Sequence, residues 1–225
     1  MSLKTTLIFD FDGLLVNSEK EYFQIISKIF KTFQVDYKWS DHAEQLGKTR
    51  QESNTILVNI INEKIINKSK RIKVDDFKKI RKKFIPKFND LELIPYVKEF
   101  VENLHKAGVK IVIATNSSRD EFEKKTTKFI DFISIFDEIF CGDDVEVTKF
   151  GYNNKYKAVL NYMSLSPKEC LVFEDSPHGV YLASSQNIDV IWVQDKLMKE
   201  YFECNHKDLC EHDNVHIFSS FKDNQ

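Results

Sequence analysis

Residues 5–19 read TTLIFDFDGLLVNSE, and this stretch decides the fold. Its first half is a short apolar run rich in β-branched and aromatic residues, which is typical of a strand buried in a parallel sheet. Asp10 and Asp12 follow two positions apart, so an extended backbone points both side chains the same way. Gly13 then permits a sharp departure of the chain. The stretch predicts a central strand that delivers acidic side chains to its carboxyl end.

Similar apolar runs recur further along the chain, at residues 109–114, 137–141, 170–173 and 189–193. Helix-like segments lie between them. The clearest is Pro95–Ala107, in which apolar residues form one stripe and Gly108 supplies a stop. Strands that alternate with helices predict an α/β fold with a doubly wound, Rossmann-like parallel sheet.

The segment after the first strand interrupts this alternation. Residues 19–88 show helical periodicity and no convincing strand. We therefore predict a helical cap domain, residues 17–91, inserted into an α/β core domain that comprises residues 1–16 and 92–225.

Composition narrows the range of partners. The 225 residues contain 33 basic and 35 acidic residues, with a net charge of −2. This balance argues against nucleic acid as the partner, because binding to a phosphate backbone needs clustered positive charge. No apolar run reaches the roughly 18 residues of a membrane span, and no signal-peptide layout opens the chain. We expect a cytoplasmic monomer that acts on a small molecule, without nucleic acid or membrane as a partner.

Polar residues follow the predicted strands at the points where ligands bind in open α/β sheets. Thr115 and Asn116 follow the second strand, and Glu174 and Asp175 follow the fourth. Carboxylates that arrive at one crevice from two strands repel each other, and a divalent cation relieves this repulsion. Hard oxygen ligands favour Mg²⁺, so we predict Mg²⁺ as the cofactor.

Four motifs occur in order: DFDGLLVNSE at residues 10–19, IATNSS at 113–118, Lys149, and VFEDSPHG at 172–179. This set resembles the haloacid dehalogenase superfamily, in the branch of phosphatases and phosphomutases with a helical cap after the first strand. The resemblance covers residues 3–195. It implies a Mg²⁺-dependent phosphatase of a sugar, polyol or nucleotide-derived phosphate, acting through an aspartyl-phosphate.

The resemblance also assigns roles to the acidic residues. Asp10 would be the nucleophile that takes the phosphoryl group, and carboxylates serve this role in other enzymes. Asp12 would be the general acid for the leaving group and then the base for water. Asp10, the Asp12 carbonyl and Asp175 would hold Mg²⁺, with Glu174 as a further metal residue, directly or through water.

Other residues would bind the substrate. Thr115 would donate a hydrogen bond to the phosphoryl group, with Asn116 beside it. Lys149 would neutralise charge on the phosphoryl oxygens. The family usually has Pro after this lysine, whereas Phe150 follows here, so Lys155 is an alternative.

In the cap, residues 46–53 read LGKTRQES and resemble the loop that determines substrate specificity in the family. Arg50 would bind a substrate phosphate or carboxylate through its planar guanidinium. Glu19, where the chain enters the cap, would also contact the substrate.

Alternative functions remain open at this point. Phosphomutases of the β-phosphoglucomutase kind resemble the chain closely, but they tend to carry a histidine after the first motif, and this neighbourhood has none. A haloacid dehalogenase lacks the second aspartate. A binding protein that only senses a phosphorylated metabolite has no need for the nucleophile, the acid and the metal residues together.

Overall fold

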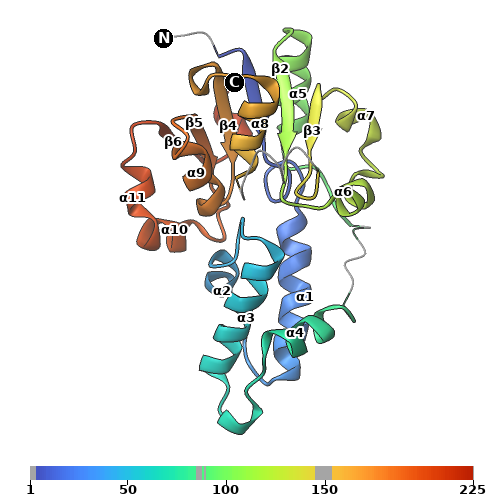
Figure 1. Cartoon of the computed structure of the whole chain (residues 1–225), viewed down its shortest axis with the longest axis vertical. Helices are drawn as coiled ribbons and strands as arrows, with labels where there is room; N and C mark the ends of the chain where they lie inside the picture. The colour runs from blue at the N-terminus through green and yellow to red at the C-terminus, as the bar shows by residue number, and fades with distance from the viewer. Residues whose placement is uncertain (1–3, 85–87, 89, 145–153, 225) are drawn as a thin grey trace.

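A six-stranded parallel sheet forms the centre of the protein in the computed structural model, which describes residues 4–84, 88, 90–144 and 154–224 (Figure 1). Its order is β3-β2-β1-β4-β5-β6. The strands are β1 (Thr6–Phe9), β2 (Lys110–Ala114), β3 (Glu138–Phe140), β4 (Cys170–Glu174), β5 (Asp189–Val193) and β6 (Val215–Phe218). The chain winds outward from β1 on both sides, so the predicted doubly wound sheet is confirmed. The carboxyl end of β1 lies at the switch point where ligands bind in such sheets.

Helices cover both faces of the sheet, because its strands are apolar on both faces. Ile8 of β1 joins one core cluster, whereas Leu7 and Phe9 join the other. The first cluster contains residues of α8 (Lys155–Met163), α9 (Pro177–Ser184), α10 (Lys199–Asn205) and α11 (Lys207–Cys210). The second contains residues of α5 (Val97–Lys106), α6 (Arg119–Thr126), α7 (Ile130–Ile133) and η4 (Phe221–Asn224). A further short turn, η3 (Pro167–Glu169), precedes β4.

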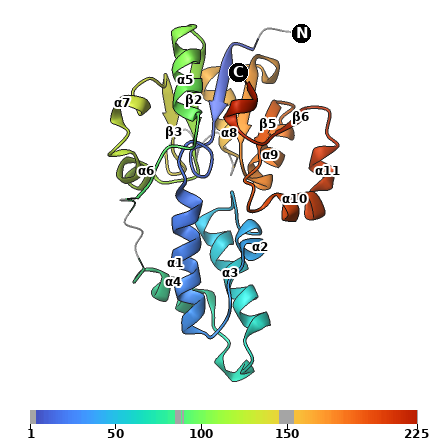
Figure 2. The same cartoon turned by 180° about the vertical axis from the view of Figure 1, so that it is seen from behind.

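A separate group of helices lies beyond the carboxyl ends of the strands (Figures 1 and 2). These helices are α1 (Ser18–Thr32), α2 (Trp39–Ala43), α3 (Arg50–Lys64), η1 (Lys68–Lys70) and α4 (Val74–Arg81). They enclose their own apolar cluster, in which Phe30, Leu57 and Phe77 are fully buried. The described residues of this segment contain no strand. The domain boundaries that the sequence predicts, at residues 17 and 91, stay a prediction.

The chain enters and leaves the helical cap at one point. Val16 pairs with Leu93 in an antiparallel bridge. Next to it, the Asn17 amide donates to the Glu92 carbonyl at 3.0 Å, and the Glu92 amide donates to the Asn17 side chain at 2.9 Å. Backbone hydrogen bonds therefore join the two linkers at the edge of the core.

Helix α9 begins immediately after Asp175 for a local reason. Ser176 is the N-cap, and its hydroxyl accepts a hydrogen bond from the Gly179 amide at 3.1 Å. Pro177 occupies the first helical position, which needs no amide proton. None of the described helices has the length and apolarity to cross a membrane.

Candidate active site

A cavity of about 580 Å³ lies between the carboxyl ends of the strands and the cap. Both parts of the chain contribute to its wall. The site residues expected from the sequence that line it are Asp10, Asp12, Glu19, Arg50, Thr115, Asn116 and Asp175. The structure thus brings these residues into one place.

Three buried carboxylates form the floor of the site. Asp10, Glu174 and Asp175 each offer an oxygen atom, and these atoms lie within 4.8 Å of one another. Within the described part of the chain, the buried Oδ1 of Asp175 has no hydrogen-bond partner. An orphaned carboxylate oxygen beside two further carboxylates fits a hard divalent cation.

The pKa values of two of these carboxylates reflect this crowding. Burial, together with the charges of Glu174 and Asp12, raises the pKa of Asp10 to about 7, against the lowering effect of Lys155. Burial and the charges of Glu174 and Asp10 raise the pKa of Asp175 well above its usual value. Both groups therefore retain a proton to a higher pH than an ordinary aspartate does, and a bound cation would oppose this shift.

Lys155 lies against the proposed nucleophile. Its Nζ is 2.5 Å from Asp10 Oδ1 and 3.0 Å from Glu174 Oε1, and the side chain is buried. Burial lowers the pKa of this lysine, but the charges of Asp10 and Glu174 outweigh that effect and raise it. Lys149, the lysine that the sequence favours, lies outside the described residues. Its role stays a prediction, and Lys155 is the lysine that the structure places at Asp10.

The start of helix α8 explains why Lys155 lies at Asp10. It is the first residue of α8, and the Asn154 side chain caps this helix by accepting from the Tyr156 and Lys157 amides. The cap fixes where the helix begins, and so it directs the lysine toward the end of β1.

Glu174 is fully engaged by protein groups. Its Oε1 accepts from Tyr156 Oη at 2.8 Å as well as from Lys155, and its Oε2 accepts from the Ser176 amide at 2.8 Å. Burial raises the pKa of Glu174, but Lys155 and these hydrogen bonds outweigh that effect and lower it. The contacts suit a carboxylate that holds Lys155 and the loop after β4 in position.

Asp12 contacts Ser117, in the loop after β2, and Lys125, which the sequence did not single out. Lys125 Nζ is 2.6 Å from Asp12 Oδ1, and the Ser117 hydroxyl donates to Oδ2 at 2.8 Å. Burial raises the pKa of Asp12, but Lys125 outweighs it, and the pKa is lowered. The one signal for Lys125 in the sequence is its position three residues after Phe122, on the buried face of α6.

The loop after β2 contacts both the core and the cap. Thr115 is buried, and its Oγ1 accepts from the Ser117 amide at 3.1 Å. Asn116 Nδ2 donates to the carbonyl of Gly47, in the predicted specificity loop, at 3.0 Å. Asn116 therefore joins the phosphate side of the cavity to the cap.

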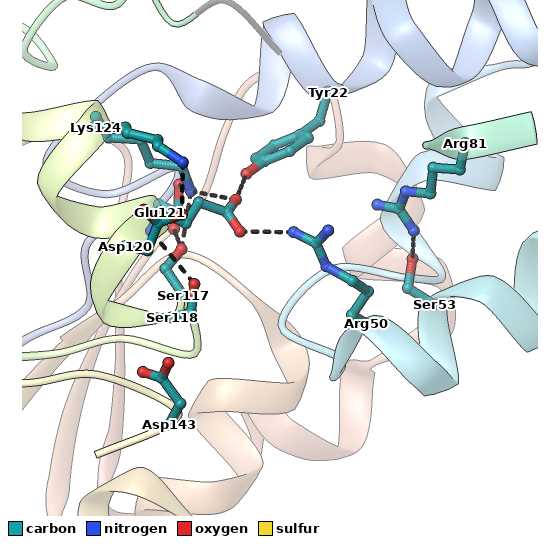
Figure 3. A network of polar contacts seen from close by, with 12 residues as sticks. Tyr22, Arg50, Ser53, Arg81, Ser117, Ser118, Asp120, Glu121, Lys124 and Asp143 are labelled. Atoms are coloured by element: carbon teal, nitrogen blue, oxygen red, sulfur yellow. Dashed lines mark hydrogen bonds and ion pairs between the residues drawn. The ribbon is translucent and has the colours of Figure 1, made fainter. Parts of the chain in front are cut away.

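The two cap residues expected to bind substrate both have protein partners. Glu19 Oε2 lies 2.8 Å from His42 Nε2 on α2. Arg50 Nη2 donates to Glu121 Oε2 on α6 at 2.6 Å, although its side chain is 68% exposed (Figure 3). Glu121 is a further residue that sequence reasoning missed.

Two glycines leave room for the acidic cluster. Gly13 has φ +80°, and a Cβ there would collide with the Asp175 carboxylate. A Cβ on Gly179 would collide with the Glu174 carboxylate. Both positions need glycine because carboxylates approach the backbone closely.

Comparisons with known proteins agree with this geometry. The family model described as haloacid dehalogenase-like hydrolase matches residues 7–193. The chain is 31% identical to (DL)-glycerol-3-phosphatase 1, mitochondrial, of Arabidopsis thaliana, over 89% of this chain and 67% of that one. It is 27% identical to a phosphorylated carbohydrates phosphatase of Thermotoga maritima, over 83% of each.

Solved structures share the fold. The crystal structure of a predicted phosphoglycolate phosphatase from Haemophilus somnus superposes with a TM-score of 0.72 at 21% identity, covering 100% of this chain and 97% of the other. At this level of identity, the likeness concerns the arrangement of the chain alone.

Proposed function

Because the chain belongs to the haloacid dehalogenase-like hydrolase family, we propose that it is a Mg²⁺-dependent phosphatase of a small phosphorylated metabolite, with Asp10 as its nucleophile. The substrate classes are a sugar, a polyol or a nucleotide-derived phosphate. The observation that carries the proposal is the buried cluster at the end of β1, where Lys155 contacts Asp10 and where, among the described residues, an oxygen of Asp175 has no hydrogen-bond partner.

Two chemical steps follow from the residues of the site. In the first, an oxygen of Asp10 attacks phosphorus, the bond to the leaving oxygen breaks, and Asp12 gives that oxygen a proton. In the second, Asp12 takes a proton from water, the water oxygen attacks phosphorus, the bond between the Asp10 oxygen and phosphorus breaks, and inorganic phosphate leaves. The product of the first step is an aspartyl-phosphate on Asp10.

The surroundings of Asp12 bear on these two roles. Lys125 favours its ionised form, which is the form that accepts a proton from water. The negative charge of an arriving phosphate opposes that preference, so substrate binding favours the protonated form needed in the first step.

The remaining residues would position the phosphoryl group of the substrate and neutralise its charge. Lys155 would contact a phosphoryl oxygen from the side of Asp10, and Thr115 and Asn116 would donate hydrogen bonds to the same group. Asp10, Asp175 and the carbonyl of Asp12 would hold Mg²⁺. When bound, Mg²⁺ neutralises the charge of the phosphoryl oxygens and of the clustered carboxylates.

Removal of the metal tests the cofactor. We expect the purified protein to release p-nitrophenol from p-nitrophenyl phosphate with Mg²⁺ and to lose at least about 10²-fold in rate in EDTA, since charge stabilisation supplies much of phosphoryl transfer. Excess Mg²⁺ is expected to restore the rate, and equal rates with and without chelator would reject the metal.

Metal affinity is expected to depend on pH. The pKa of Asp10 is raised from its usual 3.8 to about 7, so the folded metal-free protein holds a proton between these values that the unfolded chain has lost. The stability gained from that proton is present below pH 3.8 and is lost as the pH rises through about 7. Mg²⁺ must displace the proton, so its Kd is expected to rise about tenfold for each pH unit below 7. Titration calorimetry at pH 6 and 8 measures the change, and a constant Kd would contradict it.

Two alternatives predict different products. A phosphomutase would interconvert hexose phosphates without net release of phosphate, and a sensor would bind phosphorylated compounds without turnover. Phosphate release from a panel of phosphorylated metabolites distinguishes the phosphatase from both alternatives. Interconversion of hexose phosphates, which only the mutase would catalyse, distinguishes the mutase from the sensor.

Cytoplasmic residence and a monomeric state stay predictions of the sequence. All four cysteines are unpaired, and two of them, Cys141 and Cys170, are buried. Free thiols suit a reducing compartment. Size-exclusion chromatography with light scattering tests the monomer.

A further inference from the structure

Glu121, on the core helix α6, connects the cap to the catalytic acid. Its carboxylate accepts hydrogen bonds from Tyr22 Oη and, at 2.6 Å, from Arg50 Nη2, both in the cap (Figure 3). Lys125 Nζ lies 3.2 Å from the same carboxylate and 2.6 Å from Asp12. The Glu121 side chain is largely buried, with 17% of its surface exposed. One carboxylate on the wall of the cavity thus engages two cations and a phenol.

The charges of this network balance. Arg50 pairs with Glu121, and Lys125 pairs with Asp12 and Glu121, which gives two positive and two negative groups. The guanidinium that the sequence assigns to a substrate anion is therefore already neutralised. An anionic group on the substrate would have to compete with a buried carboxylate for Arg50 and would lie against its negative charge.

Further charged groups line the cavity beside this network. Asp120 also lines the cavity, and Lys124 pairs with it at 2.6 Å. Arg81, on α4, donates to neutral oxygens of α3, namely Asn54 Oδ1 at 2.7 Å and Ser53 Oγ at 3.3 Å. Among the described residues, Arg81 and Lys48 are cations of the cavity wall that form no ion pair with a carboxylate, and Lys48 Nζ lies 3.1 Å from His178 Nδ1. Arg81 is therefore a second possible site for an anionic group of the substrate.

Groups suited to hydroxyls line the same wall. Tyr22, Gln45 and Ser118 line the same cavity as Glu121. A carboxylate accepts hydrogen bonds from alcohols, and phenol, amide and hydroxyl side chains both donate and accept. The wall can therefore hold an uncharged leaving group that carries several hydroxyls.

We propose that Glu121 is a specificity-determining residue: by occupying Arg50 and Tyr22, it makes the enzyme select phosphomonoesters whose alcohol portion is uncharged and hydroxylated, and reject those with a second anionic group. This inference rests on the proposed phosphatase function and specifies its substrate class. Because the proposal concerns selectivity, it predicts the ratio of the inhibition constants of two matched ligands. General damage to the site would weaken both ligands and leave this ratio unchanged.

Glycerol 3-phosphate and 3-phosphoglycerate form the matched pair, since they differ only by a hydroxymethyl group in place of a carboxylate. Each would compete with p-nitrophenyl phosphate for the Mg²⁺-loaded enzyme, so that an inhibition constant is obtained even for a slow substrate. We expect the wild type to bind glycerol 3-phosphate at least about tenfold more tightly, because like charges placed together are costly. Glu121→Gln is expected to reduce this preference about tenfold by releasing Arg50. Glu123→Gln, an exposed site on the same helix, carries the same change of charge and should keep the wild-type ratio.

Three outcomes distinguish the role of Glu121, an anion site at Arg81 and the phosphatase function itself. An unchanged ratio in Glu121→Gln overturns the role of Glu121. A wild type that prefers 3-phosphoglycerate, and loses the preference in Arg81→Gln, overturns the proposal and places the second anion at Arg81. Absence of p-nitrophenyl phosphate turnover in the wild type, by contrast, removes the phosphatase function itself.

Discussion

Asp10→Asn is expected to lower kcat for every phosphate ester by about 10⁴-fold or more, because it removes the atom that forms the bond to phosphorus. The change is nearly isosteric, and the asparagine oxygen can still accept a hydrogen bond from Lys155, whose Nζ lies 2.5 Å from Asp10 Oδ1. The fold should therefore persist, as circular dichroism and the thermal midpoint would register.

A second measurement makes this prediction specific. Rapidly quenched wild-type enzyme is expected to carry one phosphoryl group on the peptide that contains residue 10, detected by mass spectrometry, and the variant is expected to carry none. Asp131→Asn, at an exposed position on α7, is the matched control and should retain full activity. Wild-type turnover in Asp10→Asn would reject the nucleophile.

Lys155→Met is expected to reduce kcat by about 10²–10³-fold, the usual cost of removing one charged donor from a transition state. It should also destabilise the metal-free protein by about 3–5 kcal/mol, since Asp10 and Glu174 would lose their buried cation. Methionine retains most of the apolar volume, so the loss reports on charge rather than on packing.

The comparison with Lys149→Met decides between the two lysines. If Lys155 serves the phosphoryl group, Lys149→Met should remain within about twofold of the wild type, because it then removes no group that acts on the substrate. Steady-state kinetics and urea unfolding in EDTA measure both variants. Loss of activity in Lys149→Met alone would restore the assignment that the sequence favours.

The four inner strands of the sheet could be predicted because they are buried on both faces. Runs such as residues 109–114 are apolar without alternation, and the structure places β2 at Lys110–Ala114. The carboxyl end of β1 could likewise be predicted, since Asp10 follows the apolar run directly and Gly13 comes three residues later. Local sequence carries this information, and long-range contacts add little to it.

The lysine at the nucleophile could not be predicted in the same way. Its identity depends on where α8 begins, and Asn154 fixes that point through a side-chain cap rather than through an apolar pattern. The pairs of Lys125 with Asp12 and of Arg50 with Glu121 join residues 113 and 71 positions apart. Only the tertiary arrangement brings such charges together, so the pattern of a single sequence does not indicate which residues pair.

The bridge between Val16 and Leu93 has an evolutionary consequence. The chain enters and leaves the cap through adjacent residues. We therefore expect that exchanging the intervening segment would leave β1 and the carboxylates at its end in their positions. A new substrate preference could thus arise by exchange or remodelling of this one segment, while the residues that carry the chemistry keep their places.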